Sequence, residues 1–149
     1  MSYNISVYNY ENIIKHLVDL EDQREKLVED FFPEPTRERN EFIEFLDDYI
    51  HQLELFLKEC QHDSTPSYDQ LPFVIVGCEV DVYDLEYDEI FSFRIVPPFQ
   101  YNVESQDVSC FSPVGRALLL KKIGDIIEVK APGGLFTYRI ETIRLSDER

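Results

Sequence analysis

The chain has 149 residues, 44% of them hydrophobic, which is enough apolar material for one ordinary domain or for a small domain with a helical appendage. Its formal net charge of −16, with no run of Lys or Arg, argues against direct binding to nucleic acid, because phosphate contacts need clustered basic side chains. The acidity favours a basic or metal-bearing partner, or it simply keeps the protein dispersed.

The N-terminus has no basic segment followed by an apolar core, and no run approaches the roughly 20 apolar residues of a membrane span. The three cysteines, Cys60, Cys78 and Cys110, are widely spaced and contain no Cys-x-x-Cys pair. We interpret them as reduced thiols that fill the core, rather than as disulfide or zinc ligands. We therefore expect a cytoplasmic protein that makes no membrane contact and holds no metal or cofactor of its own.

Residues 1–61 are predicted to form an antiparallel helical hairpin. From residue 10 to residue 31, apolar residues recur at alternating spacings of three and four, interrupted only at Arg24, and residues 42–60 follow the same rule. Residues 32–36 contain two prolines, which cannot continue a helix. Each arm therefore has an apolar seam that must be buried against the seam of the other arm, and the chain reverses direction between them.

Four acidic residues lie within ten positions around this reversal: Glu29, Asp30, Glu34 and Glu38. All four could face outward at the end of the hairpin. In a purely structural interpretation, Glu34 and Glu38 are acids favoured at a helix start, and Glu29 and Asp30 belong to a solvated helix face.

Residues 62–71 contain few apolar residues, and we predict a linker there. Most of the net negative charge lies in residues 1–70. Residues 1–70 carry 17 acidic and 6 basic side chains, whereas residues 71–149 carry 13 and 8.

Residues 72–149 are predicted to form a small α+β domain with four or five antiparallel strands and one short helix. Alternating apolar residues indicate a strand over residues 74–82 and a partner over residues 91–95, with a turn at residues 84–88. Ser112 and Pro113 then suit the start of a short helix. We expect this helix to carry Lys121 and Lys122 at its C-terminal end, followed by a turn at Gly124 and Asp125. A β-hairpin follows over residues 127–140, reversed by Pro132, Gly133 and Gly134.

Three linked motifs occupy this region in a fixed order: Ser-Pro-x-Gly-Arg-Ala-Leu from residue 112, Lys-Lys-x-Gly-Asp from residue 121 and Val-Lys-x-Pro-Gly-Gly from residue 129. This pattern resembles the C-terminal domain of the bacterial Gre transcript-cleavage and elongation factors. The resemblance covers residues 73–143, and the helical hairpin is similar to theirs in architecture. It implies an FKBP-like fold for the domain and RNA polymerase as the partner.

In Gre factors the hairpin enters the secondary channel of RNA polymerase, where acidic tip residues help to hold a magnesium ion that activates water. The resemblance makes Glu29, Asp30, Glu34 and Glu38 candidate magnesium ligands within the polymerase centre, while the factor itself holds no complete site. The tip run of the cleavage factors, Asp-Leu-Lys-Glu-Asn, is replaced here by residues 31–35, and the arms are shorter. Both outcomes, stimulation of transcript cleavage and modulation of elongation, therefore stay open.

The resemblance also implies that the end of a strand and the start of the short helix dock on the rim of the polymerase. The matching residues are Ser109, Phe111, Ser112 and Pro113. Phe111 stands where a polar residue is usual, and it is either an exposed anchor for a partner or a buried side chain. Ser112 and Pro113 could equally serve only as a helix cap.

Two other functional classes remain open. The coiled coil could dimerise through a second seam formed by Ile43, Ile50 and Leu57, which would make the chain an interaction protein. An FKBP-like fold also suggests prolyl isomerisation, although fold alone does not carry function. Insertion into a channel requires a monomer, which is the state that we expect, with no enzymatic activity beyond what the polymerase supplies.

Overall fold

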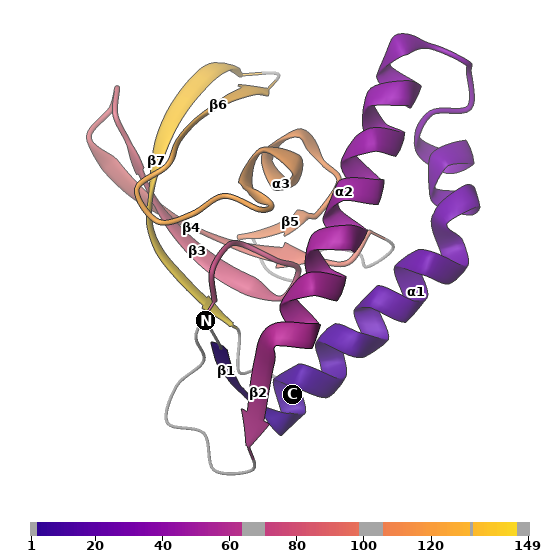
Figure 1. Ribbon diagram of the computed structural model, residues 1–149. Helices are drawn as coiled ribbons and strands as arrows, with labels where there is room; N and C mark the ends of the chain where they lie inside the picture. The colour runs from indigo at the N-terminus through magenta and orange to yellow at the C-terminus, as the bar shows by residue number, and fades with distance from the viewer. Residues whose placement is uncertain (1–2, 64–70, 99–105, 132, 146–149) are drawn as a thin grey trace. The chain divides into compact units, whose positions relative to one another are not determined.

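The computed structural model describes residues 3–63, 71–98, 106–131 and 133–145 (Figure 1). The chain divides into two compact units, residues 1–68 and residues 69–149, and each is described by itself. Most of the predicted linker, residues 64–70, lies outside the described residues. Among those described, no helix is both long enough and apolar enough to span a membrane.

The first unit is a pair of helices closed at one end by two short strands. It runs β1 (Tyr3–Ser6), α1 (Val7–Phe31), α2 (Arg37–Glu59) and β2 (Cys60–Asp63). The helices lie antiparallel and in contact (Figure 1), and β1 pairs with β2 in parallel. The sequence predicted neither strand, and residues 62 and 63, expected in the linker, belong to β2.

Both helices of the hairpin begin at capping hydroxyls. The Ser6 side chain accepts a hydrogen bond from the Asn9 N–H at 3.0 Å, and Thr36 Oγ1 accepts one from the Arg39 N–H at 3.2 Å. Each bond satisfies one of the backbone donors that a helix start leaves without a partner. The starts of both helices therefore depend on local capping as well as on the apolar seam between the helices.

The predicted seam forms the core of the first unit. Its buried side chains alternate between the helices: Ile13, Leu17, Leu20 and Leu27 from α1, and Phe42, Leu46, Tyr49, Leu53 and Phe56 from α2. Arg24, which interrupts the apolar spacing, reaches across to Asp47 with two bonds of 2.7 and 2.9 Å. The hydrogen bonds from Arg24 lower the pKa of the Asp47 carboxyl. The interruption is thus a cross-helix ion pair rather than a break in the hairpin.

One histidine of the hairpin is half-buried against a tyrosine. His16 Nε2 lies 3.2 Å from Tyr49 Oη, and the two rings meet edge to face. Burial lowers the pKa of His16 from 6.5 to about 4, against a smaller opposing effect of Asp19. His16 therefore stays neutral in the folded hairpin at pH values where an unfolded chain would already bind a proton.

We expect this histidine to weaken the hairpin in acid. Between pH 6.5 and pH 4 the unfolded state binds the proton and the folded state does not. Titration of His16 therefore leaves the free energy of unfolding unchanged above pH 6.5. Between pH 6.5 and pH 4 it lowers that free energy by up to about 1.4 kcal/mol per pH unit. Urea unfolding at a series of pH values measures this slope for the wild type and for His16→Gln. The variant should lose less stability over that range, and equal slopes would show that His16 does not contribute.

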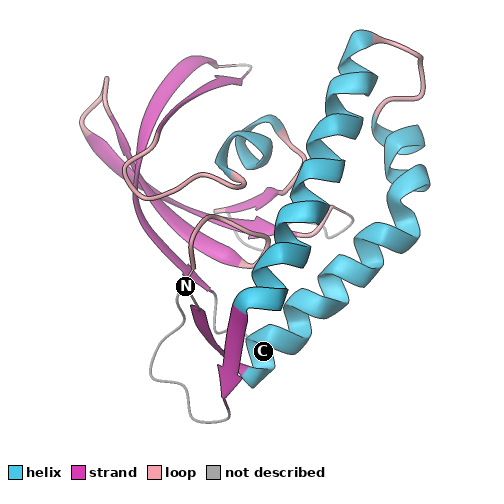
Figure 2. Ribbon diagram, viewed as in Figure 1, coloured by secondary structure: helices cyan, strands magenta, loops and turns pink. Residues whose placement is uncertain are grey.

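The second unit is a curved five-stranded sheet with one short helix. Its elements are β3 (Cys78–Asp84), β4 (Glu89–Val96), β5 (Asp107–Ser109), α3 (Pro113–Leu118), β6 (Ile126–Ala131) and β7 (Gly134–Leu145). The strand order is β5-β4-β3-β7-β6. Figure 2 shows these strands, in magenta, as one curved sheet. Neighbours are antiparallel except β4 and β5, which pair in parallel. This confirms the predicted α+β class, but the expectation of an entirely antiparallel sheet was wrong.

The helix α3 lies over the inner face of the sheet (Figure 1) and contacts β6. Alternation along the strands supplies the core between them: Cys78, Val80, Val82, Ile127, Val129 and Ile140 point inward and are buried with Leu118. The three cysteines are free and buried, as predicted, and burial raises the pKa of Cys110 and of Cys60.

Two predicted boundaries in this unit were wrong. The strand expected from residue 74 begins only at Cys78, because Val74 pairs instead with the connection after α3: its N–H donates to the Lys121 carbonyl and its carbonyl accepts from the Leu120 N–H. The same pairing ends α3 at Leu118, so Lys121 and Lys122 lie beyond the helix. The predicted turn residue Pro132 lies outside the described residues.

Candidate functional site

The tip of the hairpin is built on a cluster of phenylalanines. The Phe31 and Phe32 rings lie 5.8 and 5.1 Å from the ring of Phe42, which is fully buried. The Phe32 N–H still donates to the Val28 carbonyl at 2.8 Å, so the end of α1 is hydrogen-bonded. These contacts fix the end of α1, where the chain begins to reverse its direction.

Two of the four predicted tip acids are held in ion pairs. Glu29 Oε1 lies 3.2 Å from Arg39 Nη2 across the hairpin, and the same guanidinium donates to the Phe32 carbonyl at 2.9 Å. Asp30 pairs with Lys26 at 2.8 Å, one helical turn away. Both carboxylates therefore serve the hairpin itself, which is close to the structural interpretation made from the sequence.

The other two acids are exposed. Glu34 lies in the reversal and Glu38 in the first turn of α2, where the helix dipole favours a carboxylate. Within the described parts of the chain, neither side chain forms an ion pair or a side-chain hydrogen bond. The structure thus separates the four candidates into a paired set, Glu29 and Asp30, and an unpaired set, Glu34 and Glu38.

Arg39 is the tip residue whose role the sequence analysis missed. It also lines a hollow of about 310 Å³ on one side of the hairpin, together with Arg24, Glu25, Val28, Glu29 and Ile43. Arg39 stands ten positions from Glu29, so only the folded reversal brings the two together. The described residues contain no group of three His, Cys, Asp or Glu side chains placed to hold a metal ion.

The predicted docking stretch spans the end of β5 and the start of α3. Ser112 Oγ donates to the Ser109 carbonyl at 2.8 Å and accepts from the Gly115 N–H at 3.2 Å, so this hydroxyl caps the helix. Ser109 Oγ accepts from the Phe111 N–H at 3.4 Å. Pro113 occupies the first turn and is exposed. The stretch is therefore a rigid corner with one exposed apolar residue at its outside.

Phe111 is only 4% exposed, so of the two interpretations of its side chain the buried one is confirmed and the exposed anchor was wrong. It follows Cys110, which is also buried and whose N–H donates to the Val96 carbonyl at 2.9 Å. Ile43, Ile50 and Leu57, considered as a second seam, are half-buried rather than fully exposed.

A buried ion pair that the sequence did not predict holds the Ser109–Pro113 corner in place. Arg94 of β4 donates to both carboxylate oxygens of Asp107 at 2.7 and 2.9 Å. The side chain of Asp107 is 0% exposed and that of Arg94 is 12% exposed. Asp107 begins β5, so the pair fixes the start of the short strand that leads to Ser109. Thirteen residues separate the partners, and no local pattern reveals such a pairing.

Gly115 permits the close contact between α3 and β5. A Cβ at this position would lie 2.0 Å from the Ser109 carbonyl oxygen, far inside van der Waals contact. The glycine of the Ser-Pro-x-Gly motif is therefore required by the packing of the helix start against the strand end. This explains why the serine, the proline and the glycine occur together.

Comparison with known proteins agrees with this geometry. The family model described as "Transcription elongation factor, GreA/GreB, C-term" matches residues 69–145, which include the Ser109–Pro113 corner and the five-stranded sheet. The chain belongs to the GreA/GreB family.

Among the curated relatives of this GreA/GreB family member are proteins named transcription elongation factor GreA. The one from Rhodospirillum rubrum is 35% identical over 113 residues, covering 73% of this chain and 67% of the relative. The one from Thermoanaerobacter pseudethanolicus is 35% identical over 102 residues, covering 67% of this chain and 63% of the relative. The match thus spans slightly less than two thirds of the length of the latter protein.

A solved structure supports the fold of the family member. The prokaryotic transcription elongation factor GreA/GreB from Nitrosomonas europaea superposes with a TM-score of 0.55 at 23% identity, covering 95% of this chain and 98% of that one. At this identity the likeness concerns the fold: a helical hairpin joined to a small α+β domain.

Proposed function

We propose that this GreA/GreB family member binds RNA polymerase and regulates transcript elongation by placing the tip of its hairpin in the secondary channel of the enzyme. Membership of a family whose relatives are named transcription elongation factors supports the partner. The observation that carries the role of the tip is the pair of exposed, unpaired carboxylates, Glu34 and Glu38, at the reversal. The remaining tip acids are already bound within the hairpin.

The proposed chemistry belongs to the polymerase. Magnesium is a hard cation that takes oxygen ligands at about 2.0–2.1 Å in a nearly octahedral arrangement, and it usually combines one or two protein carboxylates with water and substrate phosphates. Two carboxylates at the tip could supply part of such a set, and such an ion would supply an activated water for cleavage. The chain would then contribute only the delivery and orientation of Glu34 and Glu38.

The arrangement of the tip favours modulation of elongation over strong stimulation of cleavage. Pro33 and Pro35 restrict the backbone on either side of Glu34. Phe31 and Phe32 are packed against Phe42, so the end of the hairpin is a stiff, partly apolar body. A body of this kind can occupy a channel while presenting only two carboxylates, Glu34 and Glu38, to the ion in the polymerase centre. We also propose that the protein acts as a monomer, which sedimentation of the purified chain would measure.

Transcription by purified polymerase tests the proposal. Elongation rate and transcript shortening would be followed on backtracked complexes with the wild type, with Glu34→Gln/Glu38→Gln and with the matched control Glu29→Gln/Asp30→Asn. We expect the first variant to lose at least about 10-fold of the effect on transcription while still binding, because its tip carries no free carboxylate. The control should keep most of the effect. Equal activity of the Glu34→Gln/Glu38→Gln variant and the wild type, or no binding by either, would contradict the proposal.

A further inference from the structure

The outer face of the sheet, opposite α3, carries a row of four side chains at one level. The strand register places Ile90 of β4 beside Tyr83 of β3, Tyr83 beside Arg139 of β7, and Arg139 beside Ile126 of β6. Because their neighbours along each strand point inward, these four side chains, called here the outer row, share the outward face. With strands about 4.8 Å apart, the row extends over roughly 14 Å.

The outer row is largely apolar and open at both ends. Ile90 is 68% exposed and Ile126 is 60% exposed. Between them the Arg139 guanidinium lies over the Tyr83 ring at 5.1 Å from its centre, and two bonds of 3.0 and 3.3 Å join it to Glu141. The one cation in the row is therefore already offset by a carboxylate.

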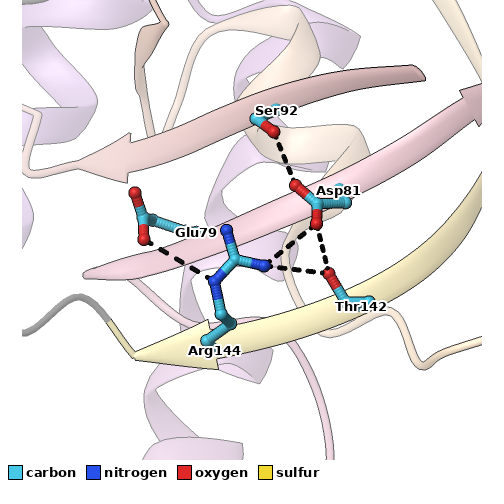
Figure 3. A network of polar contacts seen from close by, with 5 residues as sticks. All are labelled: Glu79, Asp81, Ser92, Thr142 and Arg144. Carbon is cyan, nitrogen blue, oxygen red and sulfur yellow. Dashed lines mark hydrogen bonds and ion pairs between the residues drawn. The ribbon is translucent and has the colours of Figure 1, made fainter. Parts of the chain in front are cut away.

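The neighbouring part of the same face is polar and satisfied from within. Asp81 accepts hydrogen bonds from Ser92, Thr142 and Arg144 at 2.6 to 2.9 Å, and Arg144 also lies 3.7 Å from Glu79 (Figure 3). Desolvation is the largest single effect on the Asp81 carboxyl and raises its pKa, but the three hydrogen bonds and the Arg144 charge together lower the pKa below its usual value. This network needs no partner, whereas the outer row leaves two isoleucines in water. The contrast marks the outer row as the part of the face that suits a contact.

The charges around the outer row define the partner. The β3–β4 turn presents Glu86 and Asp88, both exposed, beside Ile90. On the opposite side, Glu128 of β6 is exposed two residues from Ile126. A row of apolar side chains with acids at both ends complements a basic surface that carries apolar side chains of its own.

We propose that the outer row is a second contact of this chain with RNA polymerase, made to a basic and partly apolar protein surface of that enzyme. This contact rests on the proposed function, and it is separate from the hairpin tip and from the Ser109–Pro113 corner. It would hold the second unit on the polymerase while the tip acts elsewhere. Its effect is on affinity rather than on the chemistry at the tip.

The test measures the affinity of the full chain, labelled at its N-terminal amine, for purified core RNA polymerase. Ile90→Thr/Ile126→Thr removes the apolar ends while keeping β-branched residues in the strands. Ile123→Thr is the matched control, because Ile123 is 62% exposed but lies outside the row. We expect the double variant to raise Kd about 10-fold and the control to change it less than about 2-fold.

A second variant tests the acids at the two ends of the row: Glu86→Lys/Glu128→Lys should also raise Kd. Circular dichroism of each protein checks its fold. If the wild type binds and both sets of variants bind equally well, the outer row is not a contact, and the proposed function stands. If the wild type does not bind the polymerase, the proposed function fails and this contact fails with it.

Discussion

Replacing Gly115 by alanine is expected to lower the free energy of unfolding of the second unit by about 3 kcal/mol, the upper end of the cost of overpacking a core. The added Cβ would lie 2.0 Å from the Ser109 carbonyl oxygen and 2.9 Å from the Cys110 Cα. Both are backbone atoms in a corner held by the Ser112 cap, so neither can yield without moving α3 away from β5. Urea unfolding of the wild type and the variant measures the loss.

Gly133→Ala is the matched control for this substitution. A Cβ there would meet the Phe136 ring at 3.6 Å, an ordinary contact, so we expect a change within about 0.5 kcal/mol. Gly115→Ala should also weaken any effect on transcription, because it displaces Ser109 and Pro113 together. Similar stability of the two variants would show that α3 does not pack on β5 as described.

Replacing Asp107 by asparagine is expected to lower the free energy of unfolding by about 3–5 kcal/mol, because it removes the carboxylate that offsets the charge of the buried Arg94 guanidinium. The two bonds of 2.7 and 2.9 Å that fix the start of β5 would be lost or weakened. The matched control is Glu141→Gln, which breaks the more exposed pair with Arg139 and should change the free energy of unfolding far less, because solvent screens that pair. Equilibrium unfolding of the three proteins compares these losses.

A charge-free replacement of the buried pair sharpens this test. Arg94→Met/Asp107→Leu leaves no buried charge without a partner, so it should recover most of the stability that Asp107→Asn loses. A double variant as unstable as the single one would mean that the pair contributes through its specific hydrogen bonds rather than by cancelling two buried charges.

Apolar residues spaced alternately three and four apart predicted the hairpin, because each arm buries one apolar face against the other. Ser112 and Pro113 predicted the start of α3 because a helix cap is local chemistry. The errors came from contacts between distant segments. Val74 looked like strand because of its alternation, but its backbone bonds go to Leu120 and Lys121, which also end the helix early.

In the candidate site, too, the local contacts could be predicted from the sequence and the tertiary contacts could not. The pairing of Asp30 with Lys26 could be seen from a spacing of four residues, since such positions are neighbours on a helix. The pairing of Glu29 with Arg39 depends on how the two prolines turn the chain, and no spacing rule gives it. The burial of Phe111 and the pair between Arg94 and Asp107 likewise depend on tertiary packing.

A photo-crosslinker placed at the position of Glu34 measures whether the tip of the hairpin reaches into RNA polymerase, as we propose. A second crosslinker at Lys15, exposed on α1 far along the helix from the reversal, provides the comparison. We expect position 34 to crosslink to polymerase residues inside the secondary channel and position 15 not to. If the protein binds the polymerase but position 34 crosslinks only to its outer surface, the tip does not enter the channel.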